Sequence, residues 1–547
     1  MKTKNLKTAI LAFAAGAFVC SCNENTFLDE VNPNYPSDAT YWTTQEDLES
    51  GIATVYNSIR ASVYGYYGTY NGFIFPCNGG ADDIFVTRNE EVFTWDHIVY
   101  NNTPNTSGNV WDYLYRGISR ANVVLANTGE TCPVKAEIKD PIRGEAYFLR
   151  GFHYYLLAIN YGKALIRTEP VTSSEDCDLA MSSREEVWAQ AEKDLAEAEK
   201  LLPVERSENN YGRVTRGAAI AFLGKAYLFQ KKYKEAKAQL EKIMAAPYTY
   251  DLVEYEDNFR DDTEFNKESI FELNYAEFGD QSGLWNSGEG TDANMGNTLA
   301  NWFGPDLPVN GGWYKLQPSA YLVDEFTAEE RPAGADTKWD KRMYTTFYFK
   351  YSDYGDVKSD ETWYNDIDFD AMWTACGKKR GFGQPDYTPI NGKEGRFCLK
   401  KYTAWWCKHG PTFYGGEATW DARKTNYRVM RFAEVLLMHA EACAQTGDAA
   451  GANADLKRIR ERAGLDDKTF AAADLMKEIQ HQNLLELVME SNRLFYLKHW
   501  YDDTEFKQAM TERKKQGAES YAPKYRWLPV PQSEMDRNTL CSQTEGW

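Results

Sequence analysis

Four tryptophans of this chain stand in segments rich in glycine, asparagine and aspartate, without a regular pattern of apolar residues around them. They are Trp95, Trp285, Trp302 and Trp313, out of sixteen tryptophans in the sequence. An indole ring is a flat apolar platform, and neighbouring carboxylates and amides supply hydrogen-bond acceptors and donors. A sugar ring has apolar C–H faces and a rim of hydroxyl groups. These residues therefore predict a site for a ring-shaped ligand that is rich in hydroxyl groups.

Other aromatic residues follow helical spacing instead. Trp111, Tyr115 and Ile118 recur at the interval of one helix face, and Trp188 and Trp500 stand within or at the end of helical segments. Residues on the apolar face of an amphipathic helix pack against the protein interior. We expect these side chains to belong to the core.

The sequence contains no phosphate-binding glycine loop, no nucleophile elbow and no H-E-x-x-H motif. Asp82 and Asp83 are adjacent, so on a strand they would point to opposite faces, unlike the paired carboxylates of glycosidases. The six histidines are isolated, and His439 lies in an apolar helical segment, where we expect a structural role. We expect no catalysis. The alternative is an all-helical glycoside hydrolase that brings together distant acids such as Glu289 and Asp306.

The ten cysteines are scattered, with no C-x-x-C pair and no histidine at zinc-finger distance. This spacing predicts no structural metal site, and no motif calls for a cofactor. Cys443 falls on the apolar side of a helical pattern, so we expect a buried thiol that packs as a small hydrophobic residue.

The N-terminus has the features of an export signal. Three lysines precede an apolar run at residues 9–19, which is too short to span a bilayer. Val19-Cys20-Ser21-Cys22 resembles the lipobox at which bacterial lipoproteins are cleaved before a lipidated cysteine. We expect Cys22 to be lipidated and residues 1–21 to be the signal peptide, because bulky Val19 makes Cys20 the poorer cleavage site. The alternative is an ordinary secretory signal.

Composition is that of a globular chain, with 43% hydrophobic and 26% charged residues. No segment after the signal is apolar enough to cross a membrane. Lysine plus arginine number 61 against 81 aspartates plus glutamates, which gives a net charge of −20. This charge argues against a nucleic acid as a partner.

Helical patterns fall into two blocks, at about residues 44–246 and 427–500. GAAIAFLGKAYLFQKKYKEAKAQLEKIMAAP and EVLLMHAEACAQTGDAAGANADLKRIRERAG have the spacing of tetratricopeptide helix pairs, and IRGEAYFLRGFHYYLLAIN with SREEVWAQAEKDLAEAEKLLP forms a third pair. Ser183 and Glu186 make a capping box at the second helix of this pair. The fold is predicted to be mostly α, a tetratricopeptide-like scaffold with a long irregular insertion at about 247–426.

Five segments, in the order of the chain, resemble signature segments of the SusD/RagB family of outer-membrane nutrient-binding lipoproteins in Bacteroidota. They are RGEAYFLRGFHYYLLAINYGKALI, NYRVMRFAEVLLMHAEACAQTGD, LKRIRERAGL, LLELVMESNRLFYLKHW and YRWLPVPQSEMDRNTLCSQTEGW. The similarity extends from the lipobox through WDYLYRGISRANVVL to the end of the chain. Three family motifs are altered here, at residues 482–487, 489–493 and 543–546. These are scaffold positions, so we expect differences in local packing only.

The resemblance implies a single domain at residues 22–547, without catalysis, and a location on the cell surface, anchored to the outer membrane by lipid. It also implies a partner, a SusC-like TonB-dependent transporter, to which the family member delivers captured oligosaccharides. The acidic residues after Cys22 resemble an export tag for such lipoproteins. Some family members serve oligopeptide uptake, which is the alternative function, although the loop tryptophans favour sugar.

Family members bind sugar between a loop after the first helix and the central insertion. Carried onto this sequence, the resemblance selects Asp83 and Trp95 in the first stretch and the tryptophans between 285 and 313 in the second. A third loop, TAWWCKHGPTFYGGEATW, offers Tyr414. The predicted ligand-binding residues are Asp83, Trp95, Trp285, Trp302, Trp313 and Tyr414.

Overall fold

The computed structural model describes residues 41–62, 79–86, 98–102, 109–275, 316–349, 351–356, 397–403, 425–490 and 492–547. Within these residues the protein is mostly helical, as predicted. The first block of helices comprises α3 (Gln45–Ser62), α6 (Asn109–Asn127), α7 (Ala136–Asn160), α8 (Arg184–Leu201), α9 (Arg216–Phe229) and α10 (Tyr233–Ile243). The second comprises α15 (Phe432–Gln445), α16 (Ala449–Ala463), α17 (Leu475–Leu487), α18 (Arg493–Trp500), α19 (Asp503–Glu512) and α20 (Gln532–Arg537).

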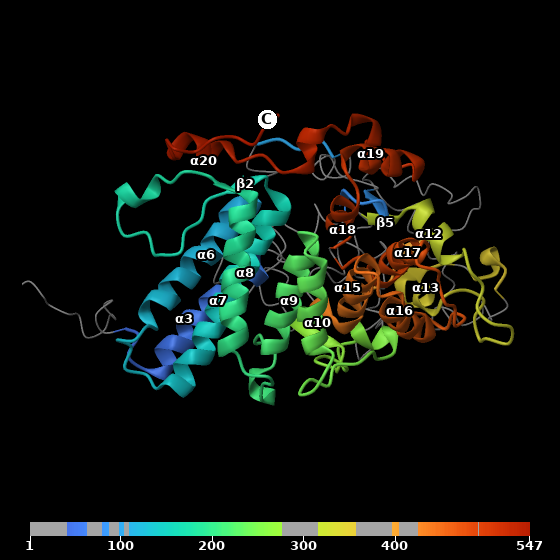
Figure 1. The fold of residues 1–547 in the computed structure, drawn as a ribbon, viewed down its shortest axis with the longest axis horizontal. Helices are drawn as coiled ribbons and strands as arrows, with labels where there is room; N and C mark the ends of the chain where they lie inside the picture. Colours follow the sequence, from blue (N-terminus) through green and yellow to red (C-terminus); the bar gives the residue numbers. More distant parts are fainter. Residues whose placement is uncertain are drawn as a thin grey trace, which may run out of the picture.

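The predicted helix pairs are α7 with α8, α9 with α10, and α15 with α16, and each pair is in contact. α10 also contacts α15, so the two helical blocks, far apart in sequence, join into one array (Figure 1). Gly224 shows why small residues recur between such helices. A Cβ atom at this position would lie 2.6 Å from Cδ2 of Leu240 on α10, so any larger residue would force the Leu240 side chain to shift.

The sequence also specifies where these helices begin and end. Ser183 accepts a hydrogen bond from the backbone N–H of Glu186, and the Glu186 carboxylate accepts one from the backbone of Ser183, which confirms the predicted capping box. α16 is capped at its N-terminus by Asp448, whose side chain accepts from the N–H of Gly451, and at its C-terminus by Gly464, which has a φ of +74°. Glycine is the residue that adopts this left-handed conformation without strain.

Strands in the described residues are short and pair into four antiparallel two-stranded sheets. The pairs are β1 (Ile84–Val86) with β5 (Leu316–Pro318), β2 (Lys163–Ala164) with β3 (Ser182–Ser183), β4 (Ser269–Leu273) with β8 (Tyr427–Arg431), and β6 (Phe347–Tyr348) with β7 (Cys398–Leu399). Two short helices, α12 (Ala320–Phe326) and α13 (Lys341–Thr346), lie in the central region, and single 3-10 turns connect other elements.

The predicted core residues are confirmed. Trp111, Trp188 and Ile118 are fully buried, and Tyr115 and Trp500 are partly buried against the same core. Cys443 is a buried free thiol. None of the described helices combines the length and the apolar character that a membrane span requires.

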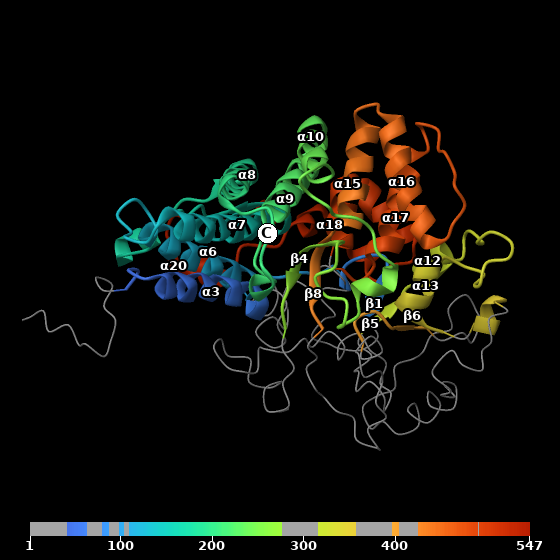
Figure 2. The ribbon, with the colours of Figure 1, turned by 90° about the horizontal axis from the view of Figure 1, so that it is seen from below.

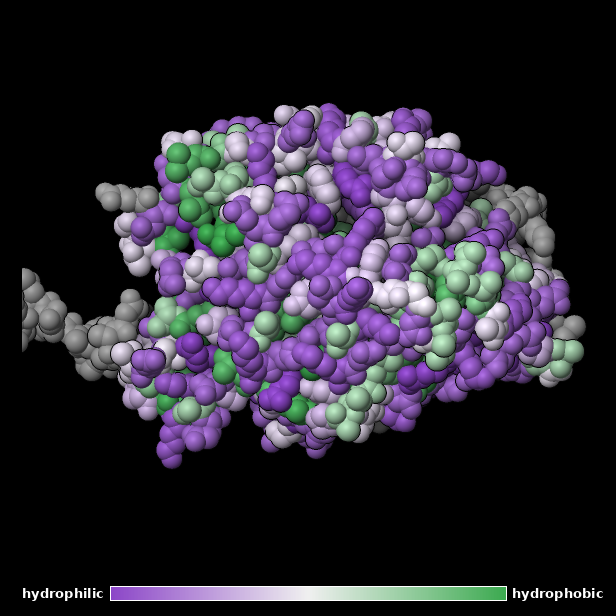
Figure 3. Space-filling model, in the orientation of Figure 1, coloured by the Kyte–Doolittle hydropathy of each residue, from purple (hydrophilic) through white to green (hydrophobic). Residues whose placement is uncertain are grey.

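The C-terminal segment returns across the N-terminal helices (Figure 1). The N–H of Leu528 donates to the carbonyl of Asn160 at 2.7 Å, and the indole N–H of Trp111 donates to Glu534 of α20 at 3.3 Å. The face shown in Figure 3 is largely hydrophilic, in keeping with the net charge of −20. The exposed large apolar residues of the described chain include Leu540, which follows α20.

Candidate functional site

Short strands lie together along one side of the helical array, as Figure 2 shows for β1, β4, β5, β6 and β8. These strands border the segments that carry the predicted ligand-binding residues. β1 precedes residues 87–97, which include Trp95, and β4 and β5 flank residues 276–315, which include the three other tryptophans. β7 and β8 flank residues 404–424, which include Tyr414.

Strand register brings the ends of these segments together. Val86, where the first segment begins, lies opposite Leu316, where the second ends. Leu273, near the start of the second segment, lies opposite Tyr427, just after the third. Paired residues of an antiparallel ladder have Cα atoms about 4.5–5.5 Å apart. Thus three segments, far apart in sequence, leave the scaffold from neighbouring positions.

Most of the predicted site residues lie outside the residues that the structure describes. These are Trp95, Trp285, Trp302, Trp313 and Tyr414, together with Cys22 and the acids Glu289 and Asp306. Their roles remain predictions.

Asp83 is described, and it lies directly before β1 with 0% exposure. No hydrogen bond from another described residue reaches either of its carboxylate oxygens. Burial raises its pKa to about 7, and the negative charge of Asp82 contributes to this shift. Among the residues that the structure describes, Asp83 is therefore buried, and it lies shortly before the segment that carries Trp95.

Asp82 anchors this part of the chain to the helices. Its carboxylate accepts two hydrogen bonds from Arg493 of α18, at 2.7 and 2.9 Å, and one from Arg513 at 2.6 Å. Although burial alone would raise the pKa of Asp82, the two arginines lower it. The ammonium group of Lys515 donates to the carbonyls of Gly79 and Ile84 on either side. Ionic contacts thus fix β1.

A second ionic cluster fixes β4 and β8. Arg431, the last residue of β8, is fully buried and donates to Glu490 at 2.7 Å and to Glu486 at 2.8 Å. It also pairs with Glu268, which directly precedes β4, while Arg462 pairs with both Glu268 and Glu486. Burial would raise the pKa of Glu486 and Glu490, but the surrounding cations lower both. The ionised carboxylates thus join β4, β8 and α17.

Lys401 extends this cluster to the third segment. Its ammonium group is buried and donates to Glu490 at 2.6 Å, to the carbonyl of Val488 at 2.7 Å and to the hydroxyl of Tyr255 at 3.0 Å. Burial lowers the pKa of Lys401 to about 8, against the opposing effect of Glu490. The chain directly before residues 404–424 is therefore held at the same place as β8.

The altered motifs of the sequence supply several of these contacts. Residues 482–487 contribute Gln482, whose carbonyl oxygen accepts from Arg342 at 2.7 Å, and also Glu486. Residues 489–493 contribute Glu490 and Arg493. These residues build the base of the candidate site, and no sequence pattern indicated their partners.

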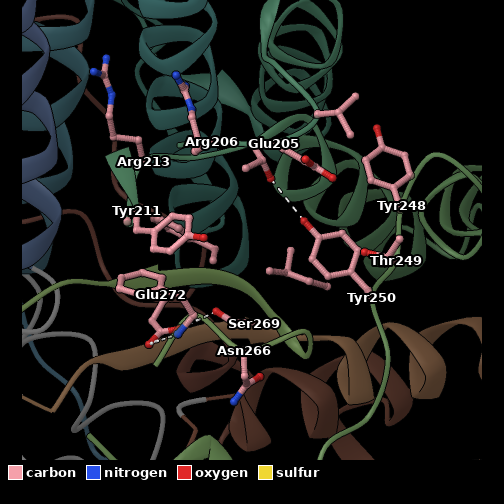
Figure 4. Close-up of a pocket in the computed structure, with 16 residues that line it drawn as sticks. Glu205, Arg206, Tyr211, Arg213, Tyr248, Thr249, Tyr250, Asn266, Ser269 and Glu272 are labelled. Carbon is pink, nitrogen blue, oxygen red and sulfur yellow. Dashed lines mark hydrogen bonds between the residues drawn. The ribbon is translucent and has the colours of Figure 1, made fainter. Parts of the chain in front are cut away.

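A cavity of about 290 Å³, here called the β4 cavity, was also missed by the sequence analysis (Figure 4). It is bounded by residues 204–215, by residues 248–250 and by β4 with the residues before it. Its side chains include Tyr211, Tyr248, Tyr250, Phe265, Arg206, Arg213 and Glu272. The aromatic residues are spread over three distant segments, so no local pattern could reveal them.

The described residues contain no group of three histidine, cysteine or acidic side chains placed to hold a metal ion. His439 hydrogen-bonds to Asp455 at 2.6 Å and lies beside Cys443. Burial alone would lower the pKa of His439, but these hydrogen bonds raise it to about 10. The ring of His439 thus has a hydrogen-bond partner within the scaffold, as expected for a structural histidine.

Comparison with known proteins gives two family models that match the chain. The model described as "SusD family" matches residues 267–547, and the model described as "starch-binding associating with outer membrane" matches residues 26–228.

Curated relatives have similar descriptions. SusD-like protein P38 of Formosa agariphila is 27% identical over 45% of this chain and 46% of that protein, so the match spans less than half of that relative. A SusD-like protein of Bacteroides ovatus is 23% identical over 91% of this chain and 83% of its own length. The starch-binding protein SusD of Bacteroides thetaiotaomicron is 24% identical over 81% of this chain and 80% of its own length.

Solved structures share the fold across nearly the whole chain. A SusD superfamily protein from Bacteroides vulgatus is 26% identical with a TM-score of 0.75, over 93% of this chain and 100% of that one. A laminarin-binding SusD-like protein is 23% identical with a TM-score of 0.70, over 92% and 100%. The first family model alone covers 281 of the 547 residues, from 267 to 547. With this match and the shared fold, the chain belongs to the SusD family.

Proposed function

We propose that this protein captures glycans at the cell surface and delivers them to a TonB-dependent transporter of the outer membrane, without catalysis. The observation that carries the proposal is the shared base of three segments. Strand register and two ionic clusters hold the ends of these segments at one place on the scaffold. The sequence places Trp95, Trp285, Trp302, Trp313 and Tyr414 in these segments.

Family membership supports this proposal. One matching family model is described as starch-binding and associated with the outer membrane. A relative of similar length is named a starch-binding protein, and a structural neighbour is named laminarin-binding. Indole rings such as those of the predicted tryptophans suit stacking on the C–H faces of sugars.

We further propose that Cys22 carries the lipid anchor and that the protein rests on its transporter. Acyl chains contribute about 0.8 kcal/mol for each buried methylene group, so two or more chains hold a protein firmly on a membrane. A specific complex buries more than about 1,000 Å² of surface. Mild detergent extraction at native expression is expected to yield a complex with a transporter. Isolation of this protein alone would contradict the partnership.

The experiment that tests the binding function is a glycan array, with a peptide library beside it, on the chain that begins after Cys22. Binding to glycans, with the bound oligosaccharide recovered unchanged after long incubation, is the expected result. Peptide binding without glycan binding would replace this function with oligopeptide capture. Cleavage of the bound oligosaccharide would show that the protein is a hydrolase.

A further inference from the structure

Tyr211 is a large aromatic side chain that remains 47% exposed on one side of the β4 cavity. Its ring lies 5.2 Å from that of Phe265, centroid to centroid, with 36° between the planes. Tyr248 and Tyr250 lie across the cavity from Tyr211 (Figure 4), and their rings stack at 6.1 Å and 15°. Aromatic rings therefore border the cavity on both sides, and one of them faces solvent.

Phe265 has a backbone φ of +54°, which is unusual for a bulky residue. Its N–H donates to the carboxylate of Glu272 at 3.1 Å, and the hydroxyl of Ser269 donates to the same carboxylate at 2.5 Å. Residues in such conformations persist where their surroundings hold them, and they concentrate at ligand sites. These hydrogen bonds thus fix the backbone that carries the ring beside Tyr211.

The two arginines of the cavity are already paired with carboxylates. Arg206 and Arg213 both donate to buried Glu145, at 2.9 and 2.7 Å, and Arg213 also donates to Glu49 at 2.7 Å. An anionic ligand would have to compete with these carboxylates for the guanidinium groups. A neutral ring that stacks on Tyr211 requires no such exchange.

The β4 cavity continues towards the candidate site. A second hollow of about 320 Å³ shares Tyr211, Gly212 and Arg213 with it and extends to Leu273 and Asn274. Leu273 ends β4, and Asn274 leads into residues 276–315, which carry three of the predicted tryptophans. A chain-like ligand bound at the candidate site could therefore extend along this hollow.

We propose that the β4 cavity is an outlying subsite, at which Tyr211 stacks on a neutral sugar residue of a long glycan chain. This inference rests on the proposed function, because the other residues of the glycan occupy the candidate site. It implies that long glycans bind more tightly than short oligosaccharides that occupy the candidate site alone.

The test compares polymers with short oligosaccharides of the same linkage. The probes are starch with maltotriose and laminarin with laminaritriose, together with any pair that the glycan array identifies. Tyr211→Ala is expected to weaken polymer binding at least about fivefold and to leave trisaccharide binding unchanged. About fivefold corresponds to the lower end of the free energy measured for rings that stack on aromatic side chains. Tyr211→Phe, which keeps the ring, and Leu540→Ala, which removes another exposed apolar side chain, are expected to bind like wild type.

Three outcomes would contradict the inference, and they are distinguishable. If wild type binds no glycan, the proposed function fails and the subsite fails with it. If wild type binds and Tyr211→Ala binds polymers equally well, the function stands and the subsite is wrong. If Tyr211→Ala weakens polymer and trisaccharide binding equally, Tyr211 belongs to the main site instead.

Discussion

Asp83 is the most unusual charged residue that the structure describes, because its carboxyl group is buried without a hydrogen bond from another described residue. Its pKa of about 7 lies above the value of about 3.9 expected in the unfolded chain. The folded state therefore binds the proton more tightly, and the stabilisation from protonated Asp83 is fully present below a pH of about 4 and is lost as the pH rises to about 7. Asp82, Arg493 and Lys515 are the charged groups that face it.

Asp83→Asn mimics the protonated form at every pH. Between pH of about 4 and 7, the stability of wild type relative to this variant should fall by up to about 1.4 kcal/mol per pH unit. Urea unfolding of both proteins at several pH values measures this difference. A difference that does not change with pH would show that Asp83 does not titrate in this range.

At the scale of elements, the contact between Asp82 and Arg493 joins residues 411 positions apart and fixes the strand β1 to α18. Removing one partner of a buried ion pair typically costs about 3 to 5 kcal/mol, because the other charge remains buried without compensation. Asp82→Asn keeps the shape and removes the charge, so we expect a loss of this size in the free energy of unfolding. Glu197→Gln is the matched control, since Glu197 pairs with Lys200 on the surface, where the side chains are 39% and 65% exposed. Equal unfolding midpoints for the two variants would contradict the anchoring role of Asp82.

The sequence predicted the helix pairs because each depends on local periodicity. Trp111 was predicted to lie in the core from its helical spacing and Trp188 from its place within a helical segment, and both are buried. Strands of two to five residues carry little local pattern, and the pairing of Val86 with Leu316 depends on the tertiary fold. For the same reason the sequence could not show that Asp83 is buried or that Tyr211 lies beside Phe265.

At the scale of the whole molecule, we propose that attachment to the membrane depends on Cys22. Cys22→Ala is expected to leave a folded protein that takes up no fatty-acid label and leaves the membrane fraction, because the acyl chains supply the apolar area for attachment. Cys20→Ala is the matched control and is expected to stay labelled. Persistent label on Cys22→Ala would contradict lipidation at this residue.

The central claim is that tryptophans in the three segments bind glycan while the helical scaffold only positions them. Calorimetric titration with the best glycan of the array, beside melting curves on the same samples, tests it most directly. Trp95→Ala and Trp302→Ala should each weaken binding by about 1 to 3 kcal/mol, the scale of stacking on an aromatic ring, with little change in melting temperature. Trp111→Ala, which removes a side chain that is 1% exposed, should instead lose about 3 to 5 kcal/mol of stability and bind normally where it is folded. If Trp95→Ala and Trp302→Ala melt far below wild type yet bind glycan normally, these tryptophans are core residues and the claim is wrong.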